Sequence, residues 1–314
     1  MSSLEVITIG RVGVDLYPEQ IGVPLAAVRT FAKSLGGSPT NVAVACARLG
    51  RRAAVVTKVG ADGFGDFVRA ALREFGVDTR WVGTDPRLRT PIVFCEIHPP
   101  DSFPLLFYRE PKAPDLNVSV DDLDLETIAG VPILWTSGTA LSDEPSRSAT
   151  LAALRSARGR TIHDLDHRPA FWPSLAEARA WAREALRSVK VVVGNLDEVE
   201  MAVGTRDPEG AAEALLALGP ELAIVKRGPD GALARSATER VLVPRVEIEV
   251  LCGLGAGDAF GGALCHGLLA GWGLERVLSF ANAAGAIVAS RLACADAMPT
   301  VAEVESVLGR GVRV

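Results

Sequence analysis

The 314-residue sequence contains few cysteines, and their distribution argues against two kinds of site. The five cysteines are widely scattered, their number is odd, and no two are spaced as Cys-x-x-Cys. A disulfide framework and a thiolate zinc site both need regular pairs, so we expect neither. Unpaired thiols are typical of a reducing compartment, and we expect a cytoplasmic protein.

An excess of positive charge and a long apolar segment are also missing. Lys and Arg number 33 against 38 Asp and Glu, which gives a net charge of −5. Nucleic-acid binding needs clustered positive charge that displaces counterions, so we expect no nucleic-acid partner. The first residues do not resemble a signal peptide, and the longest weakly polar stretch, 259–274, is broken by glycines and shorter than the roughly 20 residues of a membrane span. We expect no membrane partner.

Several common catalytic signatures are absent as well. No Lys follows a Gly, so the sequence has no P-loop. No Gly-x-Gly-x-x-Gly follows the first predicted strand, which argues against a dinucleotide-dependent dehydrogenase. The four histidines form no recognisable ligand set, and we expect them to be packed or surface residues.

The residues that are present indicate one α/β domain spanning residues 1–314. Apolar residues make up 48% and charged residues 23%, as in ordinary globular proteins. Short apolar runs predict buried strands at Val6–Ile9, 53–59, 133–136, 161–164, 189–193 and 222–226. Amphipathic patterns between them predict helices at 64–75, 146–157, 175–187 and 208–218. This alternation predicts a mostly parallel sheet with helices on both faces.

Four segments depart from the alternation. Residues 11–35 and 87–110 are strand-like without following helices, and predict a small β-structured lid inserted into the α/β body. Residues 109–121 contain two prolines and predict an exposed loop. After residue 245 the pattern predicts helices at 256–270, 274–291 and 301–308.

A glycine-rich turn, Gly253-Leu254-Gly255-Ala256-Gly257-Asp258, stands between a strand-like segment and a helix. Glycines at such a junction let backbone N–H groups and the helix N-terminus face one concave space, which predicts an anion site. Asp258 would face the same space. It could equally be an N-terminal helix residue favoured by the dipole, and spacing alone leaves both interpretations open.

A second glycine cluster, Gly36-Gly37-Ser38-Pro39-Thr40-Asn41, precedes a helix of small residues. Glycines beside a polar Asn41 allow close approach of a hydroxylated ligand. The alternative is a tight loop in which Thr40 or Asn41 caps the helix.

Taken in order, the motifs resemble those of the PfkB family of carbohydrate kinases, which have the ribokinase-like fold. Gly36-Gly37 with Asn41 and the run 59–65 match the first family signature, and Gly255–Phe260 matches the second. Asn195-x-x-Glu198 and Lys226-x-Gly228-x-x-Gly231 match two motifs between them. Segments including Asp15-Leu16-Tyr17, Phe107–Glu110 and Asp164–Pro169 are similar to the 5-dehydro-2-deoxygluconokinase subgroup, which phosphorylates the terminal hydroxyl of an acidic keto sugar in inositol breakdown.

The resemblance implies roles for residues on the nucleotide side of the site. Asp258 would be the general base, and the N–H groups of Gly255, Ala256 and Gly257 would bind the transferring phosphoryl oxygens. The implied cofactors are ATP and Mg²⁺. Nucleotide contacts fall on Asn195, Lys226, Gly228 and Asn282, and metal contacts, through water, on Asn195 and Glu198. Without the resemblance, Glu198 would be interpreted as a solvated helix charge.

The resemblance also implies the sugar side of the site. Asp15, Gly36, Gly37 and Asn41 would contact hydroxyls, while Arg109 and Arg168 would bind a carboxylate. Cys252-Gly253 replace the Asp-Thr that many members use near a monovalent cation, which argues against potassium activation. Members often pair through the lid, so the implied partners are a sugar acid, ATP and a second copy of the chain.

Other functions remain open on the sequence. The nearest are a 2-keto-3-deoxygluconate kinase and a neutral-sugar kinase such as a fructokinase or ribokinase. A catalytically silent sugar-binding regulator is disfavoured, because a binding protein needs neither Asp258 nor the complete glycine turn.

Overall fold

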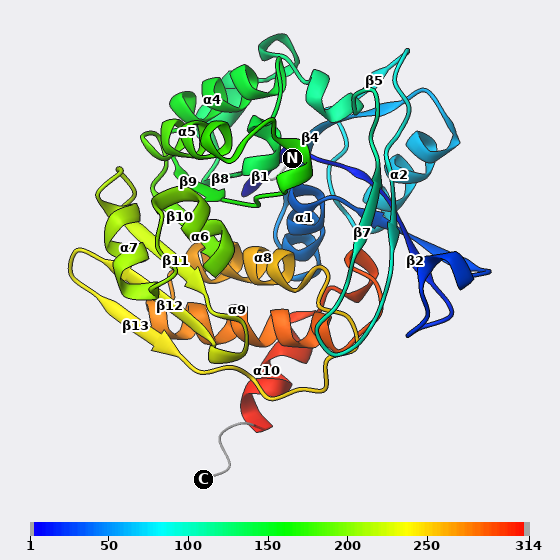
Figure 1. The fold of residues 1–314 in the computed structure, drawn as a ribbon. Coiled ribbons are helices and arrows are strands. Elements are labelled where there is room, and N and C mark those ends of the chain that lie inside the picture. Colours follow the sequence, from blue (N-terminus) through cyan, green and yellow to red (C-terminus); the bar gives the residue numbers. More distant parts are fainter. Residues whose placement is uncertain (1–2, 311–314) are drawn as a thin grey trace.

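A nine-stranded sheet forms the centre of the computed structural model, which describes residues 3–310 (Figure 1). Its strands are β1 (Val6–Ile9), β4 (Ala53–Gly60), β5 (Val82–Asp85), β8 (Ile133–Ser137), β9 (Arg160–Asp164), β10 (Val191–Asn195), β11 (Leu222–Lys226), β12 (Ala232–Ser236) and β13 (Arg240–Val243). Their spatial order is β13-β12-β11-β10-β9-β8-β1-β4-β5. All neighbours from β11 to β5 are parallel, whereas β12 and β13 add an antiparallel edge. The predicted α/β class with a mostly parallel sheet is confirmed.

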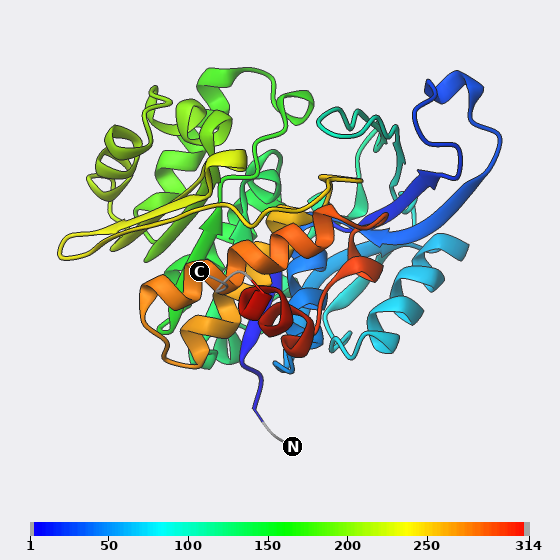
Figure 2. The ribbon, with the colours of Figure 1, turned by 90° about the horizontal axis from the view of Figure 1, so that it is seen from below.

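Helices cover both faces of this sheet (Figures 1 and 2). One face packs against α3 (Leu125–Gly130), α4 (Ser146–Ser156), α5 (Leu175–Leu186), α6 (Leu196–Val203) and α7 (Pro208–Leu216). The other packs against α1 (Ser38–Arg48), α2 (Gly63–Glu74), α8 (Ala256–Leu269), α9 (Leu274–Ala289) and α10 (Val301–Arg310). Successive strand residues alternate between the two cores, as Val55 and Val56 of β4 do. Because both faces are buried, the strands are continuous apolar runs.

The two inserted segments form one small lid sheet with the order β3-β2-β6-β7. Its strands are β2 (Gly13–Pro18), β3 (Phe31–Gly36), β6 (Ile92–Cys95) and β7 (Leu105–Tyr108). Asp15 and Tyr17 are buried on the face toward the body, whereas Leu106 and Tyr108 are exposed on the other face. The expected β-structured lid is confirmed.

Three local predictions differ from the structure. The strand predicted at 189–193 is β10, two residues later, which makes Asn195 its last residue. The β12–β13 hairpin was not predicted, because β12 is an Ala-Leu-Ala run without β-branched residues and β13 is a four-residue edge strand in which only Val243 is buried. The exposed loop predicted at 109–121 is wrong: it contains two 3₁₀ helices, Pro114–Asn117 and Val120–Asp122, and Asp115 is 2% exposed. Asp115 tolerates burial because Arg109 pairs with it.

Among residues 3–310, no helix has the length and apolar character needed to cross a membrane.

Candidate active site

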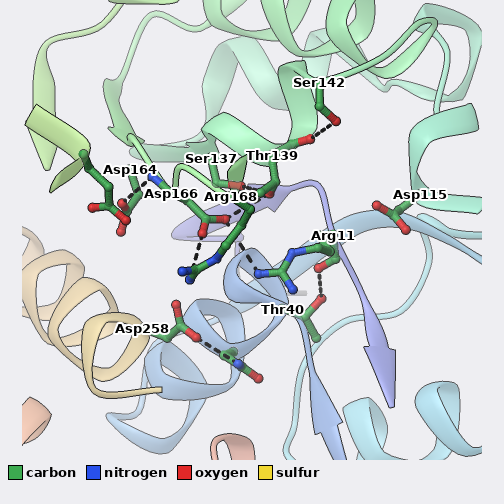
Figure 3. Close-up of polar contacts among 12 residues, drawn as sticks. Arg11, Thr40, Asp115, Ser137, Thr139, Ser142, Asp164, Asp166, Arg168 and Asp258 are labelled. Atoms are coloured by element: carbon green, nitrogen blue, oxygen red, sulfur yellow. Dashed lines mark hydrogen bonds and ion pairs between the residues drawn. The ribbon is translucent and has the colours of Figure 1, made fainter. Parts of the chain in front are cut away.

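Polar residues gather at the edge of the large sheet where its parallel strands end. The strand ends contribute Arg11 shortly after β1, Asp164 at the end of β9, Asn195 at the end of β10 and Lys226 at the end of β11. Parallel strands end at the same edge, and open α/β sheets bind their ligands there. Figure 3 shows Arg11, Asp164, Asp166, Arg168 and Asp258 facing this common region.

The glycine turn brings the N-terminus of α8 to this edge. Gly255 has a φ of +81°, and a β-carbon on it would lie 2.8 Å from the Cys294 sulfur, so only glycine fits. The N–H groups of the first helical turn have no partners within the helix, and the helix dipole adds partial positive charge. This geometry suits the oxygens of a phosphate group.

Asp258 lies in the first turn of α8, facing α1. The Asn41 amide nitrogen donates to Asp258 Oδ2 at 2.8 Å. Withdrawal from solvent raises the pKa of Asp258 to about 6, although hydrogen bonds from Asn41 and Ser38 oppose the shift. A carboxylate with such a pKa is ionised at neutral pH and still accepts a proton readily.

The second glycine cluster lets the start of α1 pack tightly on the first strands. A β-carbon on Gly37, whose φ is +104°, would lie 2.4 Å from the Arg11 carbonyl oxygen. A β-carbon on Gly36 would lie 2.1 Å from Asp15 Oδ1. The helix begins at Ser38, so Asn41 belongs to its first turn and does not precede it. The contact between Asn41 and Asp258 was not predicted, because it joins residues far apart in the sequence.

Asp15 lies on the inner face of β2 and is 9% exposed. Burial raises its pKa to about 7, the positive charge of Arg11 opposes the shift, and the Asp258 charge adds to it. Asp15 is therefore a mixture of carboxyl and carboxylate near neutral pH, able to donate or accept a hydrogen bond.

A buried lysine joins two acidic residues beside the glycine turn. Lys226 Nζ lies 3.2 Å from Asp164 Oδ2 and 3.9 Å from Glu198 Oε2. Burial alone would lower the Lys226 pKa, but these two charges raise it above its usual value. Burial raises the pKa of Glu198 to about 7. Glu198 is 5% exposed and forms a capping box with Asn195, so its interpretation as a solvated helix charge is wrong.

Two arginines share one buried aspartate in the centre of the site (Figure 3). Asp166 lies 3.2 Å from Arg168 Nη2 and 3.8 Å from Arg11 Nη2, and it accepts a hydrogen bond from Thr139 at 2.9 Å. Arg168 was predicted as a site residue, whereas Arg11 and Asp166 were not assigned a role. The signal for Arg11 was its place just after the first strand, where ligand-binding residues concentrate.

Arg109, the other predicted carboxylate ligand, already has a protein partner. Its Nη2 donates to Asp115 Oδ2 at 2.7 Å, and the side chains are 9% and 2% exposed. Its guanidinium lies 5.1 Å from the centre of the Phe171 ring, on the same ring that Arg11 approaches at 5.9 Å. The structure thus places Arg109 in the arginine cluster, but bound to Asp115.

A cavity of about 870 Å³ adjoins the glycine turn. Lys226, Gly228, Gly257 and Asn282, all predicted for the nucleotide side, line it together with Phe103 of the lid. This volume suits a nucleotide-sized ligand. The Asn282 amide nitrogen donates to the Pro244 carbonyl at 2.7 Å, which fixes its position at the cavity wall.

The described part of the chain contains no group of three or more His, Cys, Asp or Glu side chains that could hold a metal ion. Burial lowers the pKa of His163 to about 4, so this histidine is neutral and packed, as expected.

Comparison with protein families gives a match over residues 3–301 to "pfkB family carbohydrate kinase". A 5-dehydro-2-deoxygluconokinase of Shouchella clausii is 34% identical over 311 residues, covering 97% of this chain and 95% of that protein.

Solved structures resemble the chain over nearly its whole length. An Escherichia coli protein classed as a ribokinase II, in complex with ATP and Mg²⁺, has a TM-score of 0.88 at 26% identity and covers 98% of this chain and 99% of its own. The fructokinase of Vibrio cholerae O395, with fructose, ADP and calcium bound, has a TM-score of 0.84 at 28% identity. The match covers 98% of this chain and 100% of the fructokinase chain.

Proposed function

The chain belongs to the pfkB family of carbohydrate kinases, and on this premise we propose that it transfers the γ-phosphoryl group of ATP to the terminal hydroxyl of 5-dehydro-2-deoxy-D-gluconate. Relatives with this name, at 31–34% identity, support the choice of substrate. The reaction would belong to inositol breakdown. The five free, buried cysteines support a reducing, cytoplasmic location.

The observation that carries the proposal is the position of Asp258 between a helix N-terminus and a cluster of arginines. A phosphoryl group is stabilised by the helix N-terminus, and the anionic end of a sugar acid is stabilised by arginines. Asp258 would accept the proton of the attacking hydroxyl, a contribution typically worth 10²–10⁴-fold. The N–H groups of Gly255, Ala256 and Gly257 would bind the oxygens of the transferring group.

The nucleotide would occupy the 870 Å³ cavity. Lys226 and Gly228 would lie along its phosphates, and Asn282 would face the base. Lys226 is suited to this role because Asp164 and Glu198 keep it charged.

Mg²⁺ would neutralise charge on the nucleotide phosphates. Asn195 and Glu198 fit it only through bound waters, because Asn195 Oδ1 already accepts the Glu198 N–H at 2.9 Å. Indirect contact agrees with the reluctance of Mg²⁺ to lose its waters.

On the sugar side, Asp15 and Asn41 would contact hydroxyls in the space that Gly36 and Gly37 leave free of side chains. The buried Asn41 Oδ1 has no partner among the described residues, so a donor hydroxyl would satisfy it. Arg168 would bind the carboxylate, and Arg109, the other arginine expected there, would lie beside it in the lid while paired with Asp115. Closure of the lid would exclude water, a competing acceptor.

The outer face of the lid supports a homodimer formed through it. Leu106 and Tyr108 are 47% and 60% exposed there, and the Tyr108 ring contacts Phe94 edge-to-face with centroids 5.4 Å apart. Exposed apolar residues on a sheet face commonly mark an interface.

The proposal is tested by measuring ATP consumption with 5-dehydro-2-deoxygluconate, 2-keto-3-deoxygluconate, fructose and no sugar. We expect the highest kcat/KM with the first acid. Preference for 2-keto-3-deoxygluconate or fructose would identify one of the alternative kinases, and no consumption with any sugar would indicate a silent binding protein.

A further inference from the structure

Arg11 is a buried guanidinium whose hydrogen-bonding capacity the protein does not use. Its side chain is 9% exposed, and it donates no hydrogen bond to any residue in the range 3–310. Its contact with Asp166 Oδ2, at 3.8 Å, is longer than a hydrogen bond. Buried charged groups are normally paired and fully hydrogen-bonded. The unused N–H donors of Arg11 therefore indicate that a ligand binds here.

The neighbouring charges make that ligand an anion. Arg11, Arg109 and Arg168 lie in one cluster, in which Asp115 pairs with Arg109 while Asp166 serves both other arginines. Within these ion pairs the three arginines outnumber the two aspartates. Asp15 and Asp258 also act on Arg11 and Arg168, but neither pairs with them directly, so the free guanidinium donors still favour an anion.

The two arginines that share Asp166 differ clearly from Arg109. Arg109 has a short, charge-assisted hydrogen bond at 2.7 Å. Arg168 Nε is buried and has no partner in the described chain, as is also true of Arg11 Nε. The free donors of the cluster therefore lie on Arg11 and Arg168.

The surroundings hold Arg11 in place before any ligand arrives. Its guanidinium lies 5.9 Å from the centres of both the Phe107 and Phe171 rings. Its carbonyl oxygen accepts a hydrogen bond from the Thr40 hydroxyl at 3.0 Å. A fixed, partly desolvated guanidinium loses little entropy on binding a carboxylate.

We propose that Arg11 determines the specificity for acidic substrates: Arg11 and Arg168, both held by Asp166, bind the substrate carboxylate together, while Arg109 fastens the lid to Asp115. This assignment rests on the proposed function, since it names the residues that select the acid. From the sequence, Arg109 and Arg168 were expected to bind the carboxylate, whereas this assignment gives the place of Arg109 to Arg11.

The test compares 5-dehydro-2-deoxygluconate with its neutral carboxamide, using wild type, Arg11→Met and Arg11→Lys. Truncating one partner of a buried charge pair typically reduces binding by 30-fold or more. We expect Arg11→Met to raise KM for the acid at least about 30-fold while kcat/KM for the amide changes less than about threefold. Arg11→Lys retains the charge but not the fork, so it should recover part of the loss.

Two further variants separate this role from structural damage. Arg51→Met removes another largely buried arginine, which pairs with Glu5 away from the site, and should leave the acid-to-amide ratio unchanged. Arg109→Met should lower activity on the acid and the amide by similar factors, because the lid would lose its ion pair with Asp115.

The outcomes distinguish the inference from the function on which it rests. If wild type prefers the acid but neither Arg11 variant changes the acid-to-amide ratio, the inference is wrong and the function stands. A selective loss of the acid in Arg109→Met, with Arg11→Met unselective, would also overturn it. If wild type does not prefer the acid, the proposed function itself fails. Should Arg11→Met not fold, the ratio in Arg11→Lys decides.

Discussion

At the scale of single residues, the site depends on carboxyl groups whose pKa values burial has raised. Asp258 has a pKa of about 6 and Asp15 of about 7, because both lie away from solvent among other acidic groups. Perturbed carboxyls of this kind concentrate at functional sites. Their protonation has consequences for activity and for stability.

Asp258→Asn should remove most turnover while nucleotide affinity changes little, because the lost proton acceptor acts mainly in the transition state. We expect kcat to fall by about 10²–10⁴-fold. In wild type, kcat/KM should decrease as pH falls through about 6, where the base becomes protonated. Steady-state kinetics with ATP titration checks both expectations. A kcat within about threefold of wild type would exclude Asp258 as the base.

Asp15→Asn should stabilise the free protein at high pH. The pKa of Asp15 is about 7 in the folded chain against a usual value of 3.8, so between these values only the folded state holds the proton. Stability therefore falls as pH rises through this window, and above it the buried charge is a constant cost. We expect the variant to raise Tm by about 5 °C at pH 8 and by little at pH 4.

The control for this measurement is Asp121→Asn, at an exposed aspartate. Substitution of an exposed residue away from special structural features should change Tm little at either pH. A pH-independent difference for Asp15→Asn as well would show that Asp15 is not the buried titrating group.

At the scale of elements, apolar runs predicted six of the nine strands of the large sheet, because strands that are buried on both faces are continuously apolar. The short strands β5, β12 and β13 were not predicted. The glycine turn before α8 was also predicted from the sequence, because clustered glycines indicate positions where a side chain cannot fit. Contacts between distant segments were not predictable. Asn41 meets Asp258, and Arg11 meets Asp166, only after α1, α8 and β9 have assembled. The burial of Asp115 was missed because its partner Arg109 lies in the lid.

The junction between β3 and α1 is the element on which the sugar side depends most. Gly37→Ala would place a β-carbon 2.4 Å from the Arg11 carbonyl and should shift both Arg11 and the helix that carries Asn41. We expect kcat/KM to fall by at least about tenfold, as for other small misplacements of positioning residues. The measurement is kcat/KM together with Tm.

Gly50→Ala at the other end of the same helix is the matched control. Gly50 also has a positive φ, +79°, but no atom lies within 4 Å of the added β-carbon. The free energy of unfolding of the Gly50→Ala variant should be about 1 kcal/mol lower than that of wild type, and its kcat/KM should be unchanged. Equal losses of activity in both variants would mean that strain, and not the position of Arg11 and Asn41, limits the reaction.

At the scale of the whole molecule, the two faces of the lid differ, and the proposed function gives each face a separate role. The inner face carries Asp15 into the site, while the outer face exposes Leu106 and Tyr108. Leu106→Glu should therefore convert a dimer into a monomer, which sedimentation velocity can measure. Leu242→Glu, at an equally exposed leucine on the β12–β13 hairpin, should leave the dimer intact. A monomeric wild type would exclude pairing through the lid.

The central claim is that this chain phosphorylates the terminal hydroxyl of a sugar acid, and the product shows this most directly. The measurement is ³¹P–¹H NMR of the product formed from ATP and 5-dehydro-2-deoxygluconate, with ADP quantified in parallel. We predict one sugar phosphate per ADP, with its phosphorus coupled to the two protons of the terminal carbon opposite the carboxylate. Release of inorganic phosphate without a sugar phosphate, or a phosphate ester at another position, would contradict the account.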